Sequence, residues 1–436
     1  MNIKLPYGDG HLSIDIPEGR IKAILDIKSG PNSGVQTDRP PDEKEITRRA
    51  LNEPIGCPPL RELTKGKRKV TVVTSDHTRP MPSMVTMPLI LEEIRKGSPD
   101  AEILILVATG MHRATTEEEL LARFGEEICA NERIIVHDSR DKNTLRDIGT
   151  LPSGKKLELS VHALDTDLLI AEGFIEPHFF AGYSGGRKSV LPGVASYDCV
   201  VSNHSSEFIA DRNAATGLLE GNPIHMDMVA AAELAGLAFI LNVTLGEGRK
   251  IDGAFAGHPV AAHIAGCEEL TRKSTVAKVS ASIVITSNGG YPLDQNLYQL
   301  VKCMDTAEKC CDEGGVIIAV GECRDGVGSD TFFEDFSRGK SPEELTQLFL
   351  SRGPAETAAD QWQSQILARI LEKRSIIVVA PLIEESVRAM GLHFAACLES
   401  ALSLAEDLLE SPRDAGTNSP EADIVVLPDG PGLAIV

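Results

Sequence analysis

Three histidines lie in short polar segments that follow apolar runs, and imidazole is the side chain best suited to move protons near neutral pH. His112 lies in Gly110-Met-His-Arg, His178 in Glu176-Pro-His-Phe-Phe, and His204 between Asn203 and Ser205. A neutral imidazole can act as a general base or as a metal ligand. A lone loop histidine is more often a helix cap or a structural residue. The set of three therefore indicates a site more strongly than any single member.

Charged side chains and glycines accompany these histidines. Asp76-His-Thr-Arg79-Pro follows one apolar run, and Gly185-Gly186-Arg-Lys188-Ser follows another. The second segment is close to a phosphate-binding loop, but an arginine occupies the glycine position before the lysine, and no G-x-G-x-x-G is present. The glycines either permit a tight turn only or bring the backbone close to a ligand, with Lys188 presented from a rigid turn.

A second group of polar side chains lies on one predicted helix, over 293–311. Tyr298 and Gln299 precede Lys302 by four and three residues, so all three share one side of the helix. A phenol, an amide and an ammonium together suit a carboxylate, although an ordinary amphipathic helix has the same pattern. Trp362, the single tryptophan, more often indicates packing than function.

The elements that position these residues follow an α/β rhythm. Apolar, β-branched runs alternate with loops and helical patterns, and a capping box is expected at Thr116-x-x-Glu119. Such runs indicate buried parallel sheets, where ligands bind beyond the carboxyl ends of the strands. The predicted strands are 69–74, 103–108, 133–137, 168–172, 238–245, 282–287, 316–320 and 375–380.

The fold class expected is α/β, with two α/β domains, mainly parallel sheets and an active-site cleft between the domains. Residues 1–265 are predicted to form the N-terminal domain with the catalytic loops, beginning with a hairpin over 3–16. Residues 266–279 are expected to be a linker and 280–415 a smaller C-terminal domain. The last segment, 416–436, reads as a two-strand signal around Pro428 and is expected to pack back on the first domain.

The composition narrows the class of protein. The 436 residues carry a net charge of −21, which disfavours non-specific binding to nucleic acid. An anionic substrate would need cations placed locally for it. No apolar stretch is long enough for a membrane span, and Met1–Gly10 does not resemble a signal peptide. The nine cysteines contain no C-x-x-C pair. We therefore expect free thiols and a cytoplasmic location, and no zinc site.

Taken in order, these motifs resemble the nickel-dependent lactate racemase family. The resemblance covers most of the chain, and the ordered set is far more specific than any one piece. Weaker support comes from Tyr298-Gln-x-x-Lys302 and from Trp362. The motifs that carry it are Asp76-His-Thr-Arg-Pro, Gly110-Met-His-Arg, Glu176-Pro-His-Phe-Phe-Ala-Gly, Ser184-Gly-Gly-Arg-Lys-Ser and Asn203-His.

The resemblance implies a cofactor and a role for each motif residue. The cofactor would be nickel held by pyridinium-3-thioamide-5-thiocarboxylic acid mononucleotide, the nickel-pincer nucleotide. Lys188 would carry it through a covalent thioamide, and His204 would be the protein ligand to nickel. His112 and His178 would be paired bases on opposite faces of the substrate carbon. The remaining implied contacts are Asp76, Gly185 and Gly186 to the cofactor, and Arg79, Tyr298, Gln299, Lys302 and Trp362 to the substrate.

The reaction implied is racemisation of a small 2-hydroxy acid, with lactate as the default. A histidine removes the hydroxyl proton, the C2 hydride passes to the cofactor, and a planar 2-keto acid is left for return of hydride to either face. Malate, longer or aromatic hydroxy acids and sugar acids stay open as substrates. Two other classes also stay open, a nucleotide-using enzyme and a nickel-cofactor carrier. The expected partners are the hydroxy acid and the proteins that make the cofactor, with neither nucleic acid nor a membrane.

Overall fold

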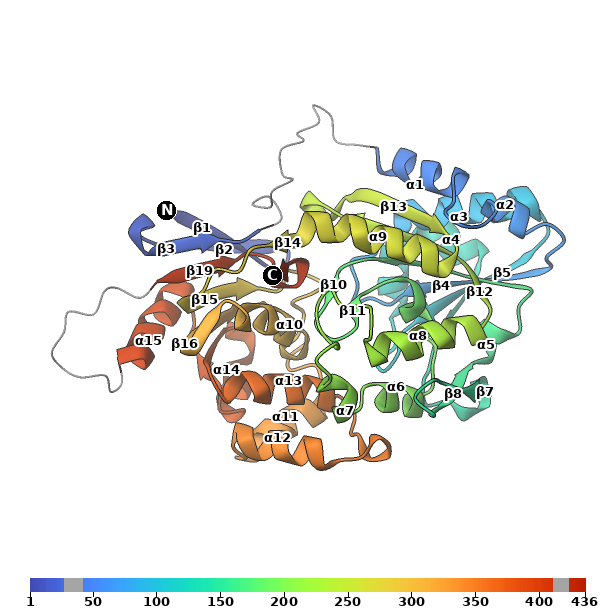
Figure 1. The fold of residues 1–436 in the computed structure, drawn as a ribbon. Coiled ribbons are helices and arrows are strands. Elements are labelled where there is room, and N and C mark those ends of the chain that lie inside the picture. The colour runs from blue at the N-terminus through green and yellow to red at the C-terminus, as the bar shows by residue number, and fades with distance from the viewer. Residues whose placement is uncertain (27–41, 411–422) are drawn as a thin grey trace. The chain divides into compact units, whose positions relative to one another are not determined.

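The computed structural model describes residues 1–26, 42–410 and 423–436, and the chain divides into two compact units. Unit 1 contains residues 1–35, 205–210 and 272–436, and unit 2 contains residues 36–204 and 211–271. Figure 1 shows both units as mixtures of helices and strands. Among the described residues, no helix is long and apolar enough to cross a membrane.

The main sheet of unit 2 has six strands in the order β13-β12-β9-β4-β5-β6. All neighbouring pairs are parallel except β12 with β13. Numbered along the chain within this sheet, the order is 6-5-4-1-2-3, which reverses between β4 and β9. In such doubly wound sheets, ligands bind beyond the carboxyl ends of the strands at this reversal. The strands are β4 (Lys69–Ser75), β5 (Glu102–Ala108), β6 (Arg133–Val136), β9 (Leu168–Phe174), β12 (Leu237–Leu245) and β13 (Ile251–Gly257).

The helices of unit 2 bury apolar residues against this sheet. Met87 and Ile94 of α3 and Phe124 of α4 join the strand residues Val72 and Ile105 in one core cluster. The expected capping box begins α4, where Thr116 and Glu119 each bond the other's backbone N–H. The helices are α1 (Glu43–Asn52), α2 (Leu60–Leu63), α3 (Ser83–Gly97), α4 (Glu117–Asn131), α5 (Val161–Leu164), α6 (Tyr197–Asn203), α8 (Pro223–Leu234) and α9 (Pro259–Ser274). Two short hairpins are also present, β7 (Leu145–Thr150) with β8 (Lys156–Ser160), and β10 (Pro177–His178) with β11 (Gly182–Tyr183).

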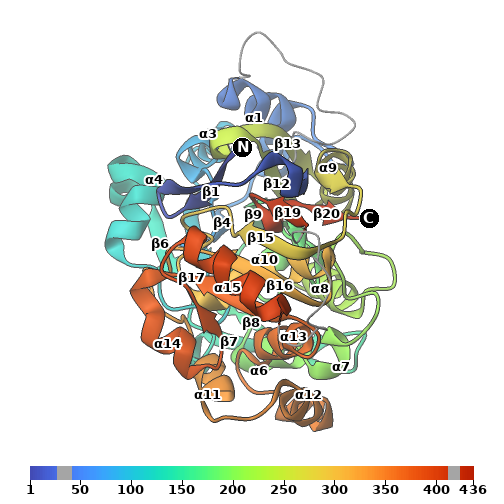
Figure 2. The same ribbon diagram turned by 90° about the vertical axis from the view of Figure 1, so that its left-hand side faces the viewer.

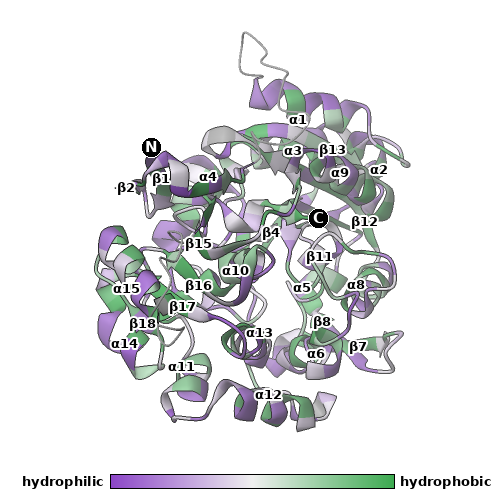
Figure 3. Ribbon diagram, turned by 60° about the vertical axis from the view of Figure 1, so that its left-hand side comes forward, coloured by the Kyte–Doolittle hydropathy of each residue, from purple (hydrophilic) through white to green (hydrophobic). Residues whose placement is uncertain are grey.

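Unit 1 contains a second six-stranded sheet, in the order β18-β17-β16-β15-β19-β3, with every pair parallel. Its strands are strongly apolar, and Figure 3 colours β15, β16 and β17 mainly green. The strands are β3 (Ile21–Ile24), β15 (Ala281–Ser287), β16 (Cys311–Val320), β17 (Ser375–Val379), β18 (His393–Phe394) and β19 (Ile424–Leu427). A separate pair joins β14 (Thr275–Val276) to β20 (Ala434–Ile435).

Helices and a hairpin cover the two faces of this sheet. The hairpin of β1 (Asn2–Tyr7) and β2 (Gly10–Asp15) shares one core cluster with α15 (Leu398–Glu410) and with alternate strand residues such as Ile318. Figure 2 shows α15 in front of the strands of unit 1. Helix α10 (Leu297–Glu308) contacts β15 and β16 but has no residue in that cluster, so it lies on the other face. The other helices are α7 (Ser206–Ile209), α11 (Asp330–Ser337), α12 (Pro342–Ser351), α13 (Gln361–Leu371) and α14 (Glu384–Ala389).

The expected domain boundaries need correction in three places. The C-terminal segment does not belong with the first domain, because β19 pairs with β15 on one side and β3 on the other. The N-terminal hairpin belongs to unit 1 and not to the domain over 1–265, because its apolar face covers the second sheet. Most of the expected linker over 266–279 is helical, since α9 continues to Ser274. Part of the tail, 416–422, lies outside the described residues.

Candidate active site

Two strands at the reversal of the unit 2 sheet lead directly into the predicted catalytic loops. β4 ends at Ser75, immediately before Asp76, and β9 ends at Phe174, four residues before His178. β5, the next strand beyond β4, ends at Ala108 and leads to His112. The parallel direction of these strands places their carboxyl ends at one edge of the sheet. The sequence expectation of clustered loops at this edge is therefore met by the topology.

Asp76 and His112 form a close pair. The Nδ1 of His112 lies 2.6 Å from the Oδ2 of Asp76, whose side chain is 2% exposed. The second carboxylate oxygen accepts from the backbone N–H and the hydroxyl of Thr78, at 3.0 and 2.6 Å. A carboxylate held in this way is an acceptor only, so His112 must donate from Nδ1. The lone pair of the neutral imidazole is then on Nε2, which is the arrangement of a general base.

The carboxylate of Asp76 stays ionised. Burial by itself would raise the pKa, but the charge that His112 carries when protonated, the hydrogen bonds from His112 and Thr78, and the charge of Arg79 outweigh it. Together they hold the pKa of Asp76 well below its usual value. Asp76 therefore keeps its charge at neutral pH and fixes the tautomer of the neighbouring imidazole.

The loop that carries Asp76 and Arg79 is held by hydrogen bonds from another helix. Arg123 of α4 donates to the backbone carbonyls of Asp76 and Arg79, at 2.5 and 2.7 Å. The guanidinium of Arg79, which is half-buried, donates to the hydroxyl of Thr78 at 3.0 Å. A cation thus lies beside the Asp76–His112 pair, and the contact of Arg79 with a substrate carboxylate stays a prediction.

His178 lies in the β10–β11 hairpin and is 6% exposed. Its Nδ1 accepts from the backbone N–H of Ala181 at 3.2 Å, so the neutral ring carries its proton on Nε2. Phe179 and Phe180 pack on the imidazole, with ring centroids 4.9 and 4.5 Å away. The two predicted bases are therefore held in opposite tautomers. His112 presents a lone pair at Nε2, and His178 presents an N–H there.

Phe180 brings three predicted residues together. Its ring centroid lies 4.5 Å from that of His178 and 5.1 Å from that of His204, and the Nζ of Lys188 lies 5.8 Å from the ring. Lys188 belongs to a 3₁₀ turn, Gly186–Ser189, that follows the β10–β11 hairpin. His204 is the C-cap residue, directly after the last residue of α6. The predicted cofactor lysine and the predicted metal ligand thus flank one aromatic ring.

His204 has the protonation state that a metal ligand needs. Its Nδ1–H donates to the carbonyl of Val200 at 2.9 Å, which leaves the lone pair on Nε2. Burial, together with the charges of Lys188 and Lys155, lowers the pKa of His204 to about 3. Within the described ranges, no group of three or more His, Cys, Asp or Glu side chains could hold a metal ion. Nickel binding by His204 stays a prediction.

The glycines before Lys188 are required by packing against the sheet. Gly185 has a φ of 79°, and a Cβ there would lie 2.8 Å from the side-chain oxygen of Asn242 and 3.0 Å from the carbonyl of Phe174. The same Asn242 oxygen accepts from the backbone N–H of Gly186 at 2.8 Å. These bonds fix the turn that presents Lys188. A direct contact from either glycine to a cofactor stays a prediction.

Backbone hydrogen bonds also link the Lys188 turn to the His112 loop. The N–H of Gly110 donates to the carbonyl of Gly193 at 3.0 Å, and the N–H of Gly193 donates to the carbonyl of Lys188 at 3.1 Å. The predicted base and the predicted cofactor lysine therefore lie in segments that share one hydrogen-bonded framework within unit 2.

The predicted substrate residues of the second group lie in unit 1, where α10 and α13 contact each other. The indole N–H of Trp362 donates to the hydroxyl of Tyr298 at 2.7 Å. Gln299 is 3% exposed, and its side-chain oxygen has no partner among the described residues. Lys302 is 8% exposed on the same helix. Trp362 thus has a defined polar partner as well as a packing role, and the joint action of this group with Arg79 stays a prediction.

Several residues that shape the site were not singled out from the sequence. Thr78 and Phe180 lie inside the quoted motifs, where a hydroxyl or a ring has no spacing signal of its own. Asn242 was detectable, because a buried amide in an apolar strand needs a specific partner. Arg123 lies on an ordinary helical surface pattern, and only the tertiary structure shows that it binds the Asp76 loop.

Comparison with known proteins identifies the relatives of this chain. Family models described as the lactate racemase N-terminal and C-terminal domains match residues 7–217 and 276–436. A lactate racemase of Thermoanaerobacterium thermosaccharolyticum is 49% identical over 435 residues, covering 100% of this chain and 99% of that protein. A lactate racemase of Lactiplantibacillus plantarum is 45% identical over 394 residues, covering 90% of this chain and 91% of that protein.

Solved structures give the same result. The lactate racemase apoprotein from T. thermosaccharolyticum superposes with a TM-score of 0.90 at 48% identity, covering 100% of both chains. A Thermotoga maritima protein superposes with a TM-score of 0.66 at 17% identity, covering 90% of this chain and 98% of that one, which shows a shared fold alone. These matches confirm the expected α/β class and the expected isomerase class. The chain belongs to the lactate racemase family.

Proposed function

We propose that this protein racemises lactate by moving the C2 hydrogen as hydride, with the nickel-pincer nucleotide attached to Lys188 and nickel bound to Nε2 of His204. The observation that carries the proposal is the pair of imidazoles held in opposite tautomers, His112 by Asp76 and His178 by Ala181. When bound, the cofactor supplies the acceptor and donor for the hydride.

The donor set fits such a group. The imidazole of His204 is neutral, with its lone pair on Nε2, and one protein nitrogen suffices where a pincer ligand supplies the remaining donors. Lys188 and His204 both lie beside the ring of Phe180, and the charge of Lys188 lowers the pKa of His204. The two side chains are therefore close enough to bind one ligand. Asn242 and the two glycines hold the turn that presents the lysine.

The chain's own residues handle the proton. His112 accepts the hydroxyl proton at Nε2, and Asp76 stabilises the imidazolium that forms, because its carboxylate keeps its charge. His178 donates a hydrogen bond from Nε2 to the substrate oxygen. For reaction of the other enantiomer the roles exchange, and the 3.2 Å contact from Ala181 to Nδ1 of His178 must open.

Binding of the substrate requires cations because the chain is strongly acidic overall. We propose substrate-binding roles for Arg79 in unit 2 and for Lys302, Gln299 and Tyr298 in unit 1. Their ammonium, guanidinium, amide and phenol donors suit two carboxylate oxygens. The assignment of lactate, and not a larger 2-hydroxy acid, rests on the names of the relatives.

The test combines mass spectrometry with an isotope experiment. Protein made in cells that synthesise the cofactor should contain a modified Lys188 and about one nickel per chain. Racemisation of lactate in heavy water should retain the original hydrogen at C2. Deuterium at C2 would contradict hydride transfer. A loaded protein that leaves lactate unchanged but inverts malate would correct the substrate, and one that inverts no hydroxy acid would indicate a cofactor carrier.

A further inference from the structure

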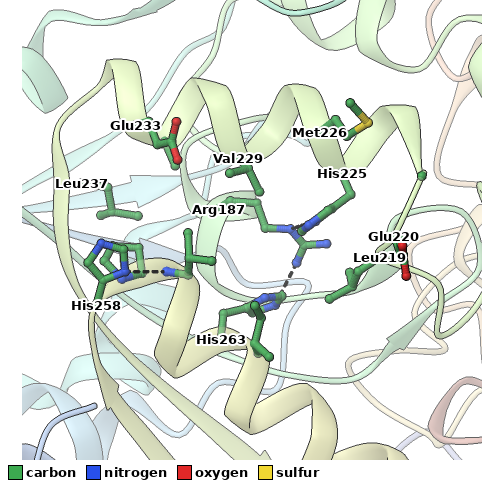
Figure 4. A pocket seen from close by; sticks show the side chains of 15 residues that line it. Arg187, Leu219, Glu220, His225, Met226, Val229, Glu233, Leu237, His258 and His263 are labelled. Carbon is green, nitrogen blue, oxygen red and sulfur yellow. Dashed lines mark hydrogen bonds between the residues drawn. The ribbon is translucent and has the colours of Figure 1, made fainter. Parts of the chain in front are cut away.

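A cavity of about 440 Å³ lies in unit 2 between α8 and α9, and the proposed reaction does not use it. Figure 4 shows side chains from both helices facing this space, with Arg187 reaching into it between His225 and His263. A cavity of this size can enclose a small organic molecule. Most of its wall is apolar, formed by Leu219, Met226, Val229, Leu237, Val260 and Ile264.

Arg187 supplies a buried positive charge to this cavity. The side chain is 3% exposed, and its guanidinium donates to the carbonyls of Ala181, Ser184 and Gly185. No carboxylate among the described residues pairs with it, and all its hydrogen-bond acceptors are neutral. Burial lowers the pKa of Arg187 only to about 10, so the charge persists at neutral pH. A buried cation without a counter-ion is unfavourable, and a nearby anion would offset that cost.

Two neutral histidines surround the guanidinium. The Nε–H of Arg187 donates to Nδ1 of His225 at 3.0 Å, and Nε2 of His263 lies 2.9 Å from both Nη1 of Arg187 and the carbonyl oxygen of Ser184. Burial and the charge of Arg187 lower the pKa of His225 to about 4 and that of His263 well below its usual value. Since His225 accepts at Nδ1, its proton lies on Nε2, and no described residue accepts from that N–H. The cavity therefore has a donor beside an uncompensated cation.

We propose that this cavity binds a small carboxylate with a hydrocarbon body. The carboxylate accepts from Nε2–H of His225 and balances the charge of Arg187, while the hydrocarbon part contacts Val229 and Ile264. A phosphate would need more donors than one imidazole offers. A neutral apolar molecule would bury the same surface but leave the cation without a partner. Glu220 and Glu233 also line the cavity, but both residues are exposed and neither pairs with Arg187.

Calorimetric titration of the full chain with hexanoate, hexanol and hexylammonium tests the proposal. Hexanoate should bind saturably at one site, and hexanol and hexylammonium should each bind at least about tenfold more weakly. Equal affinity for hexanol and hexanoate would overturn the requirement for a carboxylate. Absence of saturable hexanoate binding would overturn the site.

Variants test whether hexanoate binds in this cavity. Val229→Trp fills the cavity and should abolish binding, whereas Leu234→Trp, an exposed position on the same helix that does not line the cavity, should leave it unchanged. His225→Phe keeps a ring but removes the donor, and should weaken hexanoate about 10- to 100-fold while leaving hexanol unchanged. Lys302→Ala should not alter binding. If Lys302→Ala removes binding and His225→Phe does not, hexanoate binds the proposed active site and the inference is wrong.

Discussion

Replacing Asp76 by asparagine should disable the proposed base without changing the shape of the site. One carboxylate oxygen accepts two hydrogen bonds from Thr78, and one of these comes from a backbone N–H that cannot rotate away. The asparagine must therefore keep its carbonyl oxygen toward Thr78 and turn its NH₂ toward His112. That NH₂ donates to Nδ1, so the imidazole proton moves to Nε2. The lone pair that should accept the hydroxyl proton is then lost.

The expected loss follows from the contribution of general base catalysis. A positioned base is worth about 10²–10⁴ in rate, so Asp76→Asn should lower kcat by that factor. KM should change by less than about threefold, because Asp76 binds His112 and not the substrate in this scheme. The assay is chiral chromatography of lactate over time, with nickel and the Lys188 adduct measured on the same sample so that loading is known.

A matched variant separates the lost base from a general effect of a buried charge. Asp227→Asn removes another buried carboxylate of unit 2, one that accepts from the backbone of Ser153, and should leave kcat nearly unchanged. If loaded Asp76→Asn protein retains kcat within about threefold of the parent, the assignment of His112 as an Asp-oriented base is refuted. Loss of loading without loss of kcat per loaded site would instead make Asp76 a cofactor-binding residue.

The low pKa of Asp76 also predicts how the stability of the parent and of Asp76→Asn should depend on pH. The pKa of Asp76 is lower in the folded protein than in the unfolded chain, whose carboxyl value is about 3.9. The unfolded state thus binds the proton first as pH falls. The contribution of Asp76 to stability is full above that value and is lost at lower pH, toward the folded pKa. The midpoint temperature of thermal unfolding should therefore fall more steeply below about pH 4 for the parent than for Asp76→Asn.

Three further predictions concern other parts of the chain. Trp362→Phe and Tyr298→Phe should each raise KM for lactate about 2- to 10-fold. Both substitutions break the same hydrogen bond, so the effect on KM in the double variant should be smaller than the two single effects combined. Steady-state kinetics on the three variants measures these changes. Gly186→Ala should lower the free energy of unfolding by about 1–3 kcal/mol more than Gly66→Ala. Both glycines have positive φ, but only a Cβ at Gly186 would lie within 3 Å of another side chain. Denaturant titration measures the two losses, and equal losses would contradict the prediction. The pKa of His225 is about 4 in the folded protein and about 6.5 in the unfolded chain, so the free energy of unfolding of the parent should fall by about 1–2 kcal/mol as pH falls from 6.5 to 4. A plot of unfolding free energy against pH that is just as steep for His225→Phe would count against this.

Much of the fold was predictable because its strands are short, apolar and bounded by polar loops. The predicted strand over 103–108 and the observed β5 differ by one residue, and the predicted 375–380 and β17 also differ by one. The capping box before α4 was readable because Thr116 and Glu119 have the required spacing. These features depend on residues close together in the sequence.

The errors arose where distant segments pair. Nothing local to residues 424–427 shows that they form an inner strand between β15 and β3, since an apolar β-branched run fits any sheet. The two strands expected around Pro428 are present, but they do not pair with each other, because β19 pairs with β15 and β20 pairs with β14. Asp429 instead bridges to Asn288.

The site was predictable as a set of motifs but not as a geometry. Loop sequence placed Asp76 and His112 at neighbouring strand ends. The 2.6 Å contact between them, and the opposite tautomer of His178, depend on backbone groups such as the N–H of Ala181 that the sequence does not locate. The cavity between α8 and α9 was missed altogether. Its histidines lie 38 and 76 residues from Arg187, beyond any motif spacing.

The position of β19 determines when, during synthesis of the chain, the sheet of unit 1 can be completed. β3 is made within the first two dozen residues, and its neighbour in the sheet is β19, which lies at 424–427. A nascent chain therefore exposes the edge of β15 and an unpaired β3 until almost all of it has left the ribosome. Open strand edges of this kind favour pairing between chains. We expect chains that stop before Ile424 to aggregate, even though every predicted catalytic residue is already present in them.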